Sequence, residues 1–131
     1  MPDLWKKLNL KDQDPILVLN PPESFNDHLK DVAPRTVYSA AGKVKEVEFF
    51  LAFVKTLKDV ERATAWVAKK TQGDSVVWMA YPKQTSKKYN CEFHRDTGWD
   101  ALERIGLRGV RQVAIDEDWS ALRFRRCEYI K

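Results

Sequence analysis

The run Ser75-Val-Val-Trp-Met-Ala-Tyr-Pro82 lies between the turn residues Gly73-Asp74 and a proline that cannot donate a hydrogen bond within a sheet. A short, continuous apolar run bounded by turn residues is typical of a strand that is buried on both faces. Two earlier runs, Pro15–Asn20 and Val47–Val54, have the same character. Together, the three runs predict the centre of a parallel sheet that is covered on both sides.

Segments with helical periodicity separate these strands. Three helices are predicted, over 25–32, 57–71 and 98–105, because apolar residues recur in each at spacings of three or four. Each helix has a hydroxyl residue at its start and an aspartate three positions later, which is close to a capping box. The pairs are Ser24 and Asp27, Thr56 and Asp59, and Thr97 and Asp100.

Weaker strand patterns complete the chain. A short strand is predicted over 36–40, and residues 110–115 and 121–127 alternate between apolar and polar. The connection 116–120 is too short for a crossover helix, so the last two strands should be antiparallel. The order of elements predicts an α/β fold: a three-layer, mainly parallel Rossmann-like sheet with helices on both faces and a C-terminal antiparallel strand hairpin.

The chain has 131 residues, of which 44% are hydrophobic and 32% are charged. This size and mixture predict a single domain over 1–131. Residues 1–14 are expected to form an N-terminal arm or a short helix beside a core over 15–131. No apolar run approaches the ~20 residues of a membrane helix, and the start, Met1–Lys7, lacks the apolar part of a signal peptide. We therefore expect a cytoplasmic protein without a membrane partner.

The net charge is small. Lysine and arginine together number 23 and aspartate and glutamate 19, which gives +4. The basic residues are spread along the chain, and their densest stretch is Lys83–Arg95. This pattern argues against nucleic acid as the main partner. The two cysteines, Cys91 and Cys127, are predicted to be reduced thiols.

The turn after the first strand lacks the residues that hold a nucleotide. A phosphate site there needs glycines, so that backbone N–H groups can approach the phosphate at a helix N-terminus. The turn reads Leu19-Asn-Pro-Pro-Glu-Ser24, with no glycine and with two prolines that have no N–H. The five glycines form neither a GxGxxG motif nor a P-loop; they are Gly42, Gly73, Gly98, Gly106 and Gly109. We therefore expect no bound cofactor.

The triplet Asn20-Pro21-Pro22 resembles the Asn/Asp-Pro-Pro-aromatic motif with which amino-methyltransferases hold a planar amine. The fourth position is Glu23 instead of an aromatic residue, and the triplet follows the first strand rather than the fourth. A strand end followed by a proline at a helix start is therefore the better interpretation.

Cys91 and His94 could supply two ligands to a metal ion. A structural zinc needs four ligands and a catalytic zinc needs three. The other soft ligands, His28 and Cys127, are each alone in their segments. We expect no metal site, and no residue is assigned as catalytic.

Lys83 directly follows the third strong strand, at the edge where open α/β sheets bind ligands. Thr85 and Ser86 follow it, together with Lys87 and Lys88. This composition predicts a loop that could contact an anion, and a solvated loop without a ligand is the alternative.

Four segments resemble a bacterial family of small domains of unknown function. They are Phe49–Val54, Ser75–Lys83, Ile105–Leu107 and Ala114–Phe124, and the likeness extends over about residues 45–126. The layout is similar to the C-terminal half of a class I methyltransferase, including its terminal strand hairpin. The resemblance implies a methyltransferase-like core without the glycine loop. It marks as site positions Pro82, Lys83, Trp119, Ser120 and Arg123.

Three functional hypotheses follow. The first is a non-catalytic binding domain that has lost cofactor binding and contacts a protein partner or a second copy of itself. The second is an enzyme or sensor of a small anionic ligand at the Lys83 loop. The third is non-specific nucleic-acid binding through Lys83–Lys88 and Arg108–Arg111.

Overall fold

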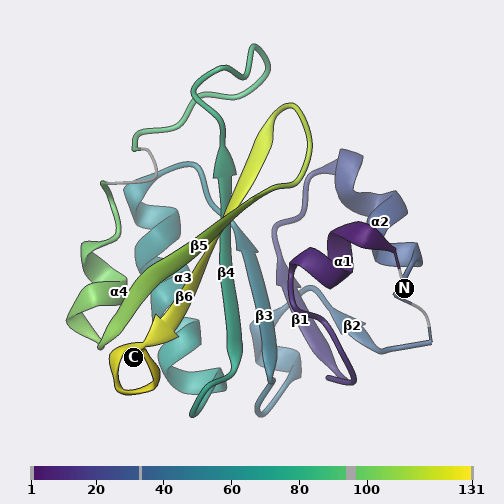
Figure 1. Cartoon of the computed structure of the whole chain (residues 1–131), viewed down its shortest axis with the longest axis vertical. Helices are drawn as coiled ribbons and strands as arrows, with labels where there is room; N and C mark the ends of the chain where they lie inside the picture. The colour runs from purple at the N-terminus through teal and green to yellow at the C-terminus, as the bar shows by residue number, and fades with distance from the viewer. Residues whose placement is uncertain (1, 33, 94–96, 131) are drawn as a thin grey trace.

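Six strands form one mixed sheet in the order β2-β1-β3-β4-β6-β5 (Figure 1). The structure is a computed structural model, which describes residues 2–32, 34–93 and 97–130. The strands are β1 (Ile16–Leu19), β2 (Val37–Tyr38), β3 (Phe49–Phe53), β4 (Val76–Pro82), β5 (Leu107–Ala114) and β6 (Trp119–Arg126). The α-helices are α1 (Asp3–Lys7), α2 (Asn26–Lys30), α3 (Leu57–Lys70) and α4 (Asp100–Arg104). Short 3-10 turns are η1 (Glu23–Phe25), η2 (Ala41–Lys43) and η3 (Cys127–Tyr129).

The central strands β1, β3 and β4 run parallel to one another and are buried at every residue. Leu51 of β3 pairs with Val18 on one side and with Trp78 on the other. Strands covered on both faces need continuous apolar sequence, and these three strands have it. The predicted α/β fold with a mainly parallel sheet is confirmed.

Helices cover both faces of the sheet, as predicted. On one face, α3 and α4 contribute the buried side chains of Val60, Val67 and Leu102. On the other face lie α1 and α2, where Trp5 and Phe25 pack against alternate strand residues. None of the helices in the described part of the chain is long and apolar enough to cross a bilayer.

The C-terminal hairpin is also confirmed. β6 pairs antiparallel with both β4 and β5, and β5 is the edge strand. Successive residues of β6 point to opposite faces: Trp119 and Ala121 pack on the α1–α2 face, whereas Leu122 and Phe124 pack on the α3–α4 face. β5 begins at Leu107, earlier than the alternating pattern over 110–115 predicted.

The prediction of three capping boxes is correct at α3 alone among the described helix starts. The Thr56 hydroxyl accepts from the Asp59 N–H at 3.1 Å, and the Asp59 carboxylate accepts from the Thr56 N–H at 3.2 Å. The N-cap residues of α2 and α4 are Phe25 and Trp99, and neither makes a side-chain cap hydrogen bond. Both helices have only five residues, so tertiary contacts set where they begin.

The N-terminal arm forms part of the layer on the α1–α2 face. Its side chains Trp5, Leu8 and Leu10 are buried. The indole N–H of Trp78 donates to the Leu8 carbonyl at 2.7 Å, and the indole N–H of Trp5 donates to the His28 carbonyl at 2.8 Å. The arm is therefore held to the sheet through its backbone as well as its side chains.

We expect Thr56→Ala to lower the free energy of unfolding by about 1 kcal/mol, because it removes the hydroxyl that caps α3. Urea denaturation measures this loss. Ser24→Ala is the matched control, since Ser24 is exposed and caps neither η1 nor α2. The control should stay within about 0.5 kcal/mol of the wild type. Equal losses in the two variants would contradict the capping role of Thr56.

We expect Trp78→Phe to cost about 1–3 kcal/mol of unfolding free energy, because it leaves the buried Leu8 carbonyl without its donor. Trp66→Phe is the matched control. Trp66 is half-buried at the rim of the core, with Lys69 and Lys70 over its ring, so its loss should be below about 1 kcal/mol. Chemical denaturation of both variants checks the difference, and a smaller loss at Trp78 than at Trp66 would refute it.

Candidate functional site

The strand order reverses between β1 and β3. From β1 the chain continues to β2 on one side, and the strands from β3 onward lie on the other side. In open α/β sheets, ligands bind outside the carboxyl ends of the strands at such a switch point. The site at this edge is therefore made from the turn after β1 and the start of α3 after β3.

The turn after β1 offers few backbone donors. Asn20 has a left-handed backbone conformation, with φ of 55°, which is a conformation that glycine adopts more readily than other residues. Pro21 and Pro22 have no N–H, and the Phe25 N–H donates to the Pro22 carbonyl at 2.9 Å. Since β1 ends before Asn20 and η1 begins at Glu23, the interpretation of this triplet as a strand end and helix start is confirmed.

Three amides around the start of α3, those of Lys55, Thr56 and Leu57, are bonded to the chain's own carboxylates. The Asp59 carboxylate accepts from the N–H groups of Lys55 and Thr56, at 2.9 and 3.2 Å. The Glu92 carboxylate, from the loop after β4, accepts from the Leu57 N–H at 2.9 Å. Two negative groups thus lie where a helix N-terminus could otherwise hold an anion.

Aromatic side chains pack in a row beside the same edge of the sheet. The ring of Phe53, the last residue of β3, lies 4.9 Å from that of Phe25 and 5.1 Å from that of Trp119. Tyr89 continues the row at 5.0 Å from Trp119. Trp119 is 3% exposed, and its indole N–H has no hydrogen-bond partner within the described structure. These rings therefore form part of the hydrophobic core at this edge of the sheet.

The loop after β4 and the tip of the hairpin lie at the same end of the sheet (Figure 1) and are hydrogen-bonded to each other. The Lys83 N–H donates to the Asp118 carbonyl at 2.8 Å, and the Ser86 hydroxyl donates to the Asp118 carboxylate at 2.8 Å. The same hydroxyl accepts from the N–H groups of Lys88 and Tyr89. A cavity of about 400 Å³ lies in this loop, and Lys83, Ser86, Tyr89 and Glu92 are among its lining residues.

The structure brings together part of the predicted site. Lys83 and Ser86 lie in the loop, and Trp119 pairs with Pro82 at its base. Thr85 is exposed in the same loop but does not line the cavity. Ser120 is buried and, by strand alternation, faces the opposite side of the sheet from Trp119.

Arg123 is separate from these residues. It pairs with Trp78 across the sheet, four residues along β6 from Trp119, which is about 13 Å. The Arg123 guanidinium donates to the Asn9 side-chain oxygen at 3.2 Å. Arg123 therefore lies apart from Lys83 and Ser120, because several strand residues separate it from the end of β4.

His94 of the Cys91–His94 pair lies outside the described residues. Cys91 is half-buried, and this burial raises the pKa of its thiol. Within the described ranges, no group of three or more His, Cys, Asp or Glu residues is arranged to hold a metal ion.

Sequence reasoning missed that Arg123 belongs to a cluster of arginines on the hairpin. Cross-strand pairing places Arg108 opposite Arg125 and Arg111 opposite Arg123. Directly opposite residues share a face, so all four side chains extend from the α1–α2 side of the hairpin. A bulge between Gly109 and Arg111 shifts the register, and this shift is why alternation within β5 alone did not reveal the pairing.

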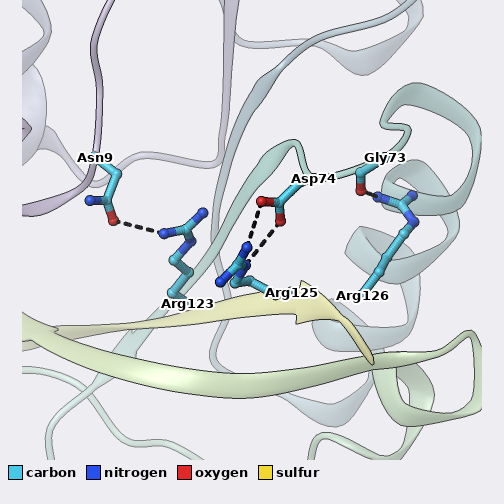
Figure 2. Close-up of polar contacts among 6 residues, drawn as sticks. All are labelled: Asn9, Gly73, Asp74, Arg123, Arg125 and Arg126. Carbon is cyan, nitrogen blue, oxygen red and sulfur yellow. Dashed lines mark hydrogen bonds and ion pairs between the residues drawn. The ribbon is translucent and has the colours of Figure 1, made fainter. Parts of the chain in front are cut away.

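One carboxylate engages this cluster. Asp74 accepts two hydrogen bonds from Arg125, at 2.6 and 2.9 Å, whereas Arg126 donates to the carbonyl of the adjacent Gly73 at 2.8 Å (Figure 2). The Arg125 guanidinium lowers the pKa of Asp74, and that carboxylate raises the pKa of Arg125. Burial, followed by the charge of Arg125, lowers the pKa of Arg123.

Solved structures share this fold. A putative type 11 methyltransferase from Sulfolobus solfataricus aligns with a TM-score of 0.54 and 7% identity, over 94% of this chain and 77% of its own. The fibrillarin pre-rRNA processing protein of Methanococcus jannaschii aligns with a TM-score of 0.52 and 13% identity, over 83% of this chain and 54% of its own. This chain thus spans about half the length of that fibrillarin. No family profile and no curated protein matches by sequence. The similarity confirms that the chain has a methyltransferase-like fold.

Proposed function

We propose that this chain is a binding domain with a methyltransferase-like fold that has lost its cofactor site. One observation carries the proposal: at the switch point between β1 and β3, several of the backbone donors that could hold an anionic cofactor are missing or already bonded. Pro21 and Pro22 provide none, and the amides of Lys55, Thr56 and Leu57 are bonded to carboxylates of the chain.

Electrostatics support the same conclusion. The carboxylates of Asp59 and Glu92 lie at the start of α3 and already satisfy its dipole. An incoming carboxylate or phosphate would have to displace them or approach two like charges. In addition, the rings of Phe25 and Phe53 pack against each other beside this edge of the sheet, with their centroids 4.9 Å apart.

The test is thermal unfolding of the chain with S-adenosylmethionine and with S-adenosylhomocysteine. A ligand present at about 100 times its Kd stabilises by about 2.7 kcal/mol, which moves Tm by several degrees in a domain of this size. We expect no shift with either compound. A methyltransferase of known cofactor affinity is the positive control. A shift of several degrees in this chain would overturn the proposal.

The second candidate is recognition of a small anion by the Lys83 loop. The observation in its favour is the cavity of about 400 Å³ that Lys83 lines together with Gln84, Ser86 and Asn90. A lysine ammonium and polar groups in one concave surface suit a phosphate or carboxylate group.

Isothermal titration with AMP, ATP and citrate tests this second candidate. If it holds, at least one compound binds the wild type, and Lys83→Gln weakens the binding at least tenfold. Lys87→Gln is the matched control, since Lys87 belongs to the same loop but does not line the cavity. Absence of heat with all three compounds, or equal weakening in both variants, would eliminate the Lys83 site.

A further inference from the structure

Four arginines on the α1–α2 side of the hairpin, Arg108, Arg111, Arg123 and Arg125, form what we call the arginine face. The described structure gives Arg108 and Arg111 no hydrogen bond or ion pair through their side chains, and both are exposed. Arg123 donates to Asn9, but its Nε is buried without a partner. Among the described residues, one of the four, Arg125, forms an ion pair, and its partner is Asp74.

Folding alone does not account for this arrangement. Like charges directly opposite each other on neighbouring strands destabilise a sheet, and the hairpin has two such pairs, Arg108 with Arg125 and Arg111 with Arg123. Charged residues on an edge strand prevent unwanted strand pairing, which would explain the two arginines of β5. Arg123 and Arg125 belong to β6, which is paired on both sides, so edge protection does not apply to them.

We propose that the arginine face binds the phosphate backbone of a nucleic acid. Guanidinium groups are planar, stay charged and form paired hydrogen bonds with phosphate oxygens. Interfaces with nucleic acids are more polar and more positive than interfaces with proteins. The sole large apolar side chain that is exposed on the described residues of β5 and β6 is Val110, so this face lacks the apolar centre of a protein interface.

This inference rests on the proposed binding role and deepens it. It names a nucleic acid as the partner, in place of the protein partner expected from the sequence, and it places the contact on the arginine face instead of Lys83–Lys88. The two proposals fail separately. Cofactor binding would overturn the loss of the methyl-donor site without touching the arginine face, and absence of nucleic-acid binding would overturn the arginine face alone.

The test measures binding of the full chain to a fluorescent DNA duplex of about 20 base pairs by anisotropy across a salt series. The binding constant should fall with salt, with a slope of about −0.9 for each phosphate contacted. We expect Arg108→Gln/Arg111→Gln to reduce the slope by about 2 and to weaken binding on the order of 10- to 100-fold at about 0.1 M salt. Lys58→Gln/Arg62→Gln, which removes the same charge from exposed positions on α3, is the matched control and should bind like the wild type.

Two further measurements are needed. The first distinguishes a loss of binding from a loss of folding, and the second distinguishes nucleic-acid binding from a general attraction to negative charge. The Arg108→Gln/Arg111→Gln variant should unfold at the same temperature as the wild type or higher, because it relieves two like-charge pairs. Polyglutamate should compete with the duplex poorly at equal charge. No binding by the wild type, equal weakening in both double variants, or equal competition by polyglutamate would overturn the proposal, and the last would indicate an acidic protein partner instead.

Discussion

Trp78 lies in the middle of β4, fully buried, and its indole N–H reaches the Leu8 carbonyl. This contact matters because β4 is buried on both faces and therefore needs a covering layer on each. On one side the fourteen-residue helix α3 provides most of that layer. On the other side, α1 and α2 have five residues each, too few to be stable helices alone. The hydrogen bonds donated by Trp78 and Trp5 hold this less stable layer in place. The position of the N-terminal arm therefore depends on its contacts with the sheet.

Polar groups that are buried or clustered need hydrogen-bond partners. This requirement explains the contacts at the switch point between β1 and β3. A helix start leaves unbonded amides, which in many α/β proteins hold a ligand's phosphate. Here the Asp59 carboxylate bonds the amides of Lys55 and Thr56 just before α3, and Glu92, 35 positions along the chain from Leu57, bonds the Leu57 amide. Under the proposed function, the chain thus satisfies with its own side chains some of the amides that a cofactor would otherwise bind. The shared fold with methyltransferases is consequently no evidence of methyl transfer, since function depends on the site and not on the architecture.

The hairpin shows the opposite situation: within the described part of the chain, the side chains of Arg108 and Arg111 have no hydrogen bond or ion pair. The guanidinium of Arg126 forms its hydrogen bonds within the molecule, to the Gly73 carbonyl and to Thr71 at the end of α3. On the other face of the hairpin, the arginine face has one ion pair with a carboxylate within the described residues, that of Arg125 with Asp74. Uncompensated charge at this density lowers stability, and such positions are typical of surfaces that serve binding rather than folding. Under the proposal, one face of this strand serves folding and the other serves binding.

The sequence alone determined the central strands, helix α3 with its cap, the hairpin and the lack of a glycine loop. Each of these depends on neighbouring residues: continuous apolar runs, a regular helical spacing, a short connection, or the absence of one residue type. What only the tertiary structure decided depends on contacts between distant segments. Strand length separates Arg123 from Lys83, alternation turns Ser120 away from Trp119, and the bulge in β5 sets which arginines face one another. No local pattern contains this information, because the register between two strands is set by how they pack and not by either strand alone.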